Sequence, residues 1–167
     1  MLLRVLLLSL ALFGTCSADP AAEYATSQIM KVVEQSVKLG QVEPIRFLLN
    51  DTLNYSMCGY TGNRATFNGY LETQMNSLID VKFIVDYGNA SIEKKDDVEI
   101  LKFHVETHAI YADRSRVEGL AQVTAVKRKY GAMFYVSNIT QNCRITAKRH
   151  HRLYRVFTNE NLYDYRK

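Results

Sequence analysis

From Val81 onward, apolar and polar residues alternate with a period of two, which is typical of strands that bury one face of a sheet. We expect the stretch Asp97–Phe157 to supply consecutive long strands that organise the fold. On one strand, the side chains expected on the inward face are Leu101, Phe103, Val105, Thr107, Ala109 and Tyr111. On the next strand, the residues expected on the inward face are Val117, Gly119, Ala121, Val123 and Ala125. This second face is so small in volume that another group is expected to pack closely against it.

The first half of the chain has helical periodicity instead. Asp19 and Pro20 are a typical N-cap and first helical residue, and Gly40 is a typical C-cap. A short helix should follow at Glu43–Leu49, then a strand at Thr52–Met57 and a loop at Gly59–Asn63. Asn63 or Thr66 can cap a further helix, whose inward stripe would be Phe67, Tyr70, Leu71, Gln74 and Leu78.

Turn-forming residues divide the second half into strands. Gly88–Asn89 indicates a bulge or turn, and Lys94–Asp97 indicates a charged hairpin connection. Met133–Val136 is apolar on both faces, which favours an interior strand. Asn138–Asn142 is the expected reversal before a last strand from about Arg144 to Phe157.

This order of elements resembles the nuclear transport factor 2-like superfamily of the cystatin-like α+β class. The segments that carry the resemblance are Ala21–Leu39, Ile45–Leu49 after Pro44, Tyr55, Thr66–Leu71 and Arg152–Phe157. The chain looks like small secreted nematode members of that superfamily, and the resemblance implies N-terminal helices packed inside a strongly curved antiparallel sheet, shaped like a cone. A cystatin proper is the nearest alternative. The superfamily contains isomerases, dehydratases and pure binding modules, so the fold alone does not decide the activity.

The N-terminus has the features of a secretory signal peptide. A basic Arg4 precedes the apolar segment Val5–Phe13, and Cys16–Ala18 offers small residues for cleavage before Asp19. The apolar segment is too short to span a bilayer. We therefore expect residues 1–18 to be removed, leaving one domain over residues 19–167 that is secreted, with no membrane span. Loss of Arg4 from 21 basic residues leaves 20 against 17 acidic ones, a net charge near +3.

Two further features agree with an oxidising, extracellular location. Cys58 and Cys143 are the only cysteines left after cleavage, so they are expected to form a disulfide, with two free thiols as the alternative. Four N-glycosylation sequons also occur, at Asn50, Asn54, Asn89 and Asn138.

Candidate sites inside the cone are rich in tyrosine. The inward-facing candidates for a pocket are Tyr55, Tyr87, Thr107 and Tyr111. None is a carboxylate or imidazole, so the general base that an isomerase or dehydratase would need is missing from this set. On the opposite face of the same strand, His104, Glu106 and His108 have the spacing of metal ligands, but a solvated or interface strand is the preferred interpretation. No cofactor is expected.

Basic residues concentrate in two runs near the end of the chain. If the last strands pair, a patch would form from Lys127, Arg128, Lys129, Lys148, Arg149 and Arg152. Such a patch could attract an acidic glycan or phospholipid headgroups, while secretion disfavours nucleic acid as a partner. A sheet edge protected by charge is the alternative explanation.

These observations favour a secreted, N-glycosylated and non-enzymatic domain. Its partner would be either a small apolar ligand or another protein, and the sheet could also form a homodimer. The alternatives are an isomerase- or dehydratase-like enzyme that uses the cone interior and a basic extracellular glycan-binding protein.

Overall fold

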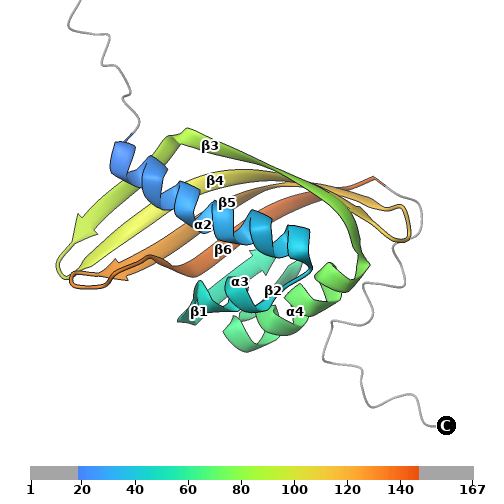
Figure 1. Cartoon of the computed structure of the whole chain (residues 1–167), viewed down its shortest axis with the longest axis horizontal. Helices are drawn as coiled ribbons and strands as arrows, with labels where there is room; N and C mark the ends of the chain where they lie inside the picture. The colour runs from blue at the N-terminus through green and yellow to red at the C-terminus, as the bar shows by residue number, and fades with distance from the viewer. Residues whose placement is uncertain (1–18, 147–167) are drawn as a thin grey trace, which may run out of the picture.

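A computed structural model describes residues 19–146 of the chain. In it, a long, curved sheet partly surrounds the helices (Figure 1). The expected signal peptide, residues 1–18, lies outside the described residues, as does the expected continuation of the last strand to Phe157. The α+β fold class predicted from the sequence is confirmed.

The first helix begins and ends where the sequence predicts, and the second begins where predicted but ends at Phe47, before Leu49. Helix α2 (Pro20–Leu39) starts at Asp19, whose side chain accepts a hydrogen bond from Ala21 N, and it ends at Gly40 in the left-handed conformation (φ 64°). Both features satisfy backbone groups that a helix end leaves unpaired. The short helix α3 (Glu43–Phe47) follows. Helix α2 lies across one face of the sheet (Figure 1).

A hairpin and a third helix complete the first half. Strand β1 (Leu49–Met57) pairs with a short strand, β2 (Tyr60–Asn63), in the segment that the sequence predicted as a loop. That prediction was wrong because the turn is only Cys58–Gly59, with positive φ at both residues, so pairing resumes at once. Helix α4 (Arg64–Ser77) begins at Asn63, one of the two predicted caps, through a capping box with Thr66.

The remaining strands are long. They are β3 (Leu78–Lys95), β4 (Val98–Tyr111), β5 (Arg116–Arg128) and β6 (Tyr135–Ile145), and the order across the sheet is β2-β1-β6-β5-β4-β3. The register of β3 against β4 shifts between Asp86 and Ser91, which is the bulge predicted around Gly88–Asn89. The hairpin at Asp96–Asp97 also lies where the sequence predicts.

Two predictions about the end of the sheet were wrong. Asn138–Asn142 is no reversal: β6 runs through it without a break and pairs with β5 along its length. The alternate residues Asn138, Thr140 and Asn142 face outward, so their polar character reflects the exposed face of a continuous strand. In addition, β6 pairs with β1 in parallel, so the sheet is mixed and not wholly antiparallel.

The core lies between the helices and the concave face of the sheet. Leu53, Leu101, Phe103 and Ala125 are at most 1% exposed, and Ile29 and Met30 of α2 pack in the same cluster. The inward faces of β4 and β5 therefore match the predicted apolar sets. The burial of these side chains holds α2 against the sheet and leaves a hollow beside it.

Candidate ligand-binding cavity

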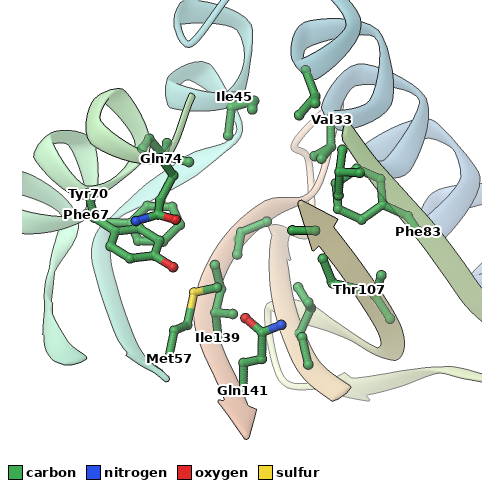
Figure 2. Close-up of a pocket in the computed structure, with 18 of the residues that line it drawn as sticks. Val33, Ile45, Met57, Phe67, Tyr70, Gln74, Phe83, Thr107, Ile139 and Gln141 are labelled. Atoms are coloured by element: carbon green, nitrogen blue, oxygen red, sulfur yellow. The ribbon is translucent and has the colours of Figure 1, made fainter. Parts of the chain in front are cut away.

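A cavity of about 220 Å³ lies in the concavity of the sheet. Its walls come from α2, α3, α4, β1 and the inward faces of β3 to β6 (Figure 2). Residues on its walls include Val33, Met57, Phe67, Tyr70, Leu71, Gln74, Phe83, Phe103, Val105, Thr107, Ala109, Tyr111, Ala121, Val123, Ile139 and Gln141. By proportion to a cavity of about 150 Å³ that binds benzene, this volume suits a ligand of about nine non-hydrogen atoms.

The walls are almost entirely apolar. Among the described residues that line the cavity there is no Asp, Glu, His, Lys or Arg, and the lining Cys58 is held in a disulfide. The polar side chains of the lining are Tyr70, Gln74, Thr107, Tyr111 and Gln141. The chemistry available within these walls is therefore hydrogen bonding by neutral groups.

Gln141 is the most deeply buried of these polar residues. It is 7% exposed, and its side chain has no hydrogen-bond partner among residues 19–146. It lies opposite Ala121 of β5 and Met57 of β1 in the sheet, so its side chain shares the inward face. Figure 2 shows its amide group directed into the cavity. A buried polar group is ordinarily hydrogen-bonded, so this amide offers an open donor and an open acceptor.

Gln74 and Thr107 occupy comparable positions in the other walls. Gln74 belongs to the inward stripe of α4, and Thr107 lies between Val105 and Ala109 on the inward face of β4. Neither side chain has a hydrogen-bond partner within the described part of the chain. In Figure 2 the amides of Gln74 and Gln141 point into the space between α4 and β6.

Tyr111 also lines the cavity, near the end of β4. Burial raises the pKa of its hydroxyl from 10.0 to about 12, because the charged tyrosinate would lose its hydration. The hydroxyl is therefore uncharged at physiological pH. It can donate a hydrogen bond to a ligand, but it is a poor acid.

The four pocket residues named from the sequence divide into two pairs. Thr107 and Tyr111 line the cavity. Tyr55 is buried in the core, with its ring 5.0 Å from that of Phe67, and it does not line the cavity. Tyr87 is half-buried and also lies outside the lining, because it falls at the bulge where β3 leaves the regular register.

Gln141 was missed by the sequence analysis because it was placed in a reversal. The signal that could have found it is the alternation Ile139, Gln141, Cys143, Ile145, which continues the period of two through the supposed turn. Gln74 was placed on the correct helix face, and its departure from the apolar pattern was the available hint.

The predicted disulfide between Cys58 and Cys143 is present. It joins the end of β1 to β6, two strands that are already neighbours, and Cys58 N also donates to Gln141 O at 3.2 Å. Gly119 pairs with Cys143 in the adjacent strand, and a Cβ built there would lie 3.2 Å from Cys143 Sγ and 2.8 Å from Gln141 Nε2. The small-residue face of β5 therefore makes room for the disulfide and the Gln141 amide, as its pattern predicted.

The four sequon asparagines lie on strands. Asn54 and Asn89 are exposed, while Asn50 and Asn138 are half-buried. Asn54 and Asn138 are direct partners in the parallel β1–β6 pair and occupy the outer face of the sheet together. Asn50 Oδ1 accepts a hydrogen bond from Thr52 Oγ1 at 2.8 Å, and Asn138 Nδ2 donates one to Thr140 Oγ1 at 3.4 Å. In both sequons, therefore, the asparagine side chain contacts the threonine hydroxyl of the same sequon.

His104, Glu106 and His108 lie on the outer face of β4, away from the cavity. His108 Nε2 is 2.8 Å from Glu106 and its Nδ1 is 3.8 Å from Glu118 of β5. No group of three or more metal-ligating side chains is found among residues 19–146. These contacts are those of a solvated strand face with cross-strand pairs.

The first basic run is partly neutralised where the structure describes it. Lys127 Nζ is 2.5 Å from Glu99 and lies over the ring of Phe134, and Lys129 Nζ is 3.3 Å from Asp97. Arg128, between them, is exposed. Lys148, Arg149 and Arg152 lie outside the described residues, so the combined patch stays a prediction.

Comparison with known proteins addresses the fold. No family model matches the sequence, and no curated protein matches it either. Solved structures do match. A protein provisionally assigned as a dehydratase of the nuclear transport factor 2-like family, from Streptomyces avermitilis, aligns over 74% of this chain and 97% of its own. The TM-score is 0.54 and the identity is 9%.

This chain has the nuclear transport factor 2-like fold. Two proteins from Novosphingobium aromaticivorans align with higher TM-scores. One, provisionally assigned as an aromatic ring hydroxylase, covers 77% of this chain and 95% of its own at a TM-score of 0.60 and 10% identity. The other, provisionally assigned as a scytalone dehydratase, covers 77% and 88% at 0.59 and 14% identity. At these identities the likeness concerns the fold and carries no activity to this chain.

Within this fold the cavity lies between the helices and the concave face of the sheet. No helix among residues 19–146 is long and apolar enough to cross a membrane.

Proposed function

We propose that this protein is a secreted, N-glycosylated binding domain that holds a small apolar ligand in the cavity of its cone. The observation that carries the proposal is the cavity itself: about 220 Å³ lined mostly by apolar side chains within a formed sheet and helix framework. Concave, mostly apolar sites with a few convergent polar groups are the common form of small-molecule sites.

The lining supports binding rather than catalysis. A dehydratase or isomerase needs a group that takes a proton from the substrate, and the described lining residues offer only amides, hydroxyls and a tyrosine with a raised pKa. The disulfide and the exposed sequon residues support the secreted, glycosylated part of the proposal. A homodimer through the sheet remains a separate prediction.

A variant that fills the cavity tests the proposal. Ala121 lies on the cavity wall and is 6% exposed, so Ala121→Leu adds three carbon atoms directly into the space. The control is Gln122→Leu, which introduces the same side chain at the next residue of β5 on the exposed outer face. The probe is ethylbenzene, which has eight non-hydrogen atoms and so falls within the estimated capacity of about nine.

We expect ethylbenzene to bind the wild-type protein and the Gln122→Leu variant in a calorimetric titration, and to lose at least about tenfold in affinity for Ala121→Leu. The circular dichroism spectrum and the thermal midpoint of each variant establish that it is folded. Equal affinity for the two variants, or no binding to the wild type, would contradict the proposal.

A further inference from the structure

The polar side chains of the cavity are distributed in a way that suggests what kind of ligand it takes. Three walls of the cavity, otherwise apolar apart from the tyrosines, each contain one neutral amide or aliphatic hydroxyl residue. These residues are Gln74 in α4, Thr107 in β4 and Gln141 in β6. A cavity that binds only hydrocarbon gains nothing from such groups, because each must give up hydrogen bonds to water.

Gln141 is held in place by its backbone. It pairs with Ala121 on one side and with Met57 on the other, and its carbonyl accepts from Cys58 N beside the disulfide. Gly119 leaves the space that its amide occupies. The residue is only 7% exposed, and its amide has no hydrogen-bond partner among the described residues. Such an amide is matched by a ligand atom that donates or accepts a hydrogen bond.

The same walls disfavour a charged ligand. The lining residues within 19–146 provide no side chain of either sign, so a carboxylate or an ammonium group would be buried without a counter-charge. Burial of an unpaired charge costs far more than burial of a hydroxyl or carbonyl group that finds a hydrogen bond.

We propose that the cavity selects an uncharged ligand with a hydroxyl or carbonyl group on an apolar body, and that Gln141 is the hydrogen-bond partner of that group. Gln74 and Thr107 are additional neutral partners on the facing walls. The inference rests on the proposed function, since it names the ligand class of the same cavity.

A series of ligands with one skeleton tests the selection. Ethylbenzene and benzyl alcohol have the same number of non-hydrogen atoms and differ by the replacement of a methyl group with a hydroxyl. Benzylammonium and benzoate place a positive or a negative charge at the same end of the ring. Affinities for all four are measured at neutral pH by calorimetry or by displacement observed with NMR.

We expect the wild-type protein to bind benzyl alcohol at least as tightly as ethylbenzene, and to bind the two ions at least about tenfold more weakly. In Gln141→Leu, the affinity for benzyl alcohol relative to ethylbenzene should fall roughly five- to tenfold, the usual effect of one lost hydrogen bond. The control Gln122→Leu should leave this ratio unchanged, because Gln122 lies on the outer face. If Gln141→Leu does not fold, Gln74→Leu on the half-buried face of α4 provides the second variant, with the same direction expected.

The outcomes separate the two proposals. If none of the four compounds binds, the proposed function fails and the selection fails with it. If ethylbenzene binds while benzyl alcohol binds much more weakly, or if Gln141→Leu and Gln74→Leu leave the ratio unchanged, the cavity is a binding site but the selection by its amides is overturned. Binding of benzoate or benzylammonium as tightly as the alcohol would also overturn it.

Discussion

Gly119 shows how one missing side chain shapes the cavity. A Cβ at this position would lie 2.7 Å from Asn142 O and 2.8 Å from Gln141 Nε2, closer than real Cβ atoms approach other groups. The backbone oxygen cannot move without disturbing the β5–β6 pairing. The small side chains of β5 are therefore a requirement of the packing around Gln141 and the disulfide.

We predict that Gly119→Ala lowers the free energy of unfolding by roughly 1–3 kcal/mol, the usual cost of overpacking. The matched control is Gly88→Ala in β3, where the nearest atom to a new Cβ is Asp86 Oδ1 at 3.7 Å. Urea denaturation of both variants measures the difference. An unfolding midpoint for Gly119→Ala equal to that of Gly88→Ala would contradict this account of the β5 face.

Tyr111 gives a residue-scale test of burial in the cavity wall. Its folded pKa of about 12 exceeds the ordinary value of 10.0, so the folded protein keeps the hydroxyl proton at pH values where the unfolded chain loses it. The stabilisation that results is complete below pH 10.0 and is lost as pH rises through about 12.

We therefore predict that Tyr111→Phe has a shallower loss of stability than the wild type as pH rises across this range. The control is Tyr130→Phe, because Tyr130 is 93% exposed. Denaturation at a series of alkaline pH values measures the slopes. Identical slopes for the wild type and Tyr111→Phe would show that the hydroxyl is not buried in the folded state.

At the scale of elements, the helices were predictable from residues that act locally. Asp19, Gly40 and Asn63 satisfy backbone groups at helix ends through contacts within a few residues, so the sequence alone identifies them. The inward faces of β4 and β5 were also predictable, because the alternation of apolar and polar residues directly indicates which side chains of a strand are buried.

The β6 strand was mispredicted because its outward residues resemble a turn. Asn138, Thr140 and Asn142 are polar because they face solvent, and their order in the chain does not reveal this. Parallel pairing of β1 with β6 joins segments about 80 residues apart, as in the pair Asn54–Asn138, and no local pattern records it. Because this part of β6 was predicted as a reversal, Gln141 was not recognised as an inward-facing residue.

The disulfide is expected to stabilise the contact between β1 and β6. Cys58 and Cys143 are 85 residues apart, so the bond restricts a long loop in the unfolded chain. We predict that the double variant Cys58→Ser, Cys143→Ser loses up to about 4–5 kcal/mol of stability, the limit given by the chain-entropy model. Guanidinium denaturation of the variant and of the wild type measures the loss. Coincident midpoints would indicate that the bond does not constrain the unfolded chain.

The sequons on β1 and β6 make a further prediction. Asn54 and Asn138 are direct partners on the outer face, so glycans at both sites would lie side by side over that end of the sheet. We expect the protein secreted from eukaryotic cells to lose mass on treatment with an N-glycosidase, and the variant Asn54→Gln, Asn138→Gln to lose less. Intact-mass spectrometry gives both values. An unchanged mass for the wild type would contradict the secreted, glycosylated part of the proposal.

At the scale of the whole molecule, the sheet and helices form a framework around one apolar cavity. The fold class was predictable because the order of elements restricts how a curved sheet can cover its helices. The ligand site was only half predictable. Thr107 and Tyr111 followed from the alternation in β4, whereas Tyr55 and Tyr87 share the inward pattern and yet miss the cavity, because one packs in the core and the other lies at a bulge.

We propose that this cavity binds a small neutral ligand through its apolar walls and the Gln141 amide. The most direct test is a crystal structure of the protein grown with para-bromobenzyl alcohol, whose bromine is located by its anomalous scattering. We predict a bromine peak between α4 and the inward faces of β4 to β6, with the alcohol oxygen within hydrogen-bond distance of the Gln141 side chain. A cavity without bromine at saturating ligand, or bromine only on the outer face of the sheet, would contradict the account.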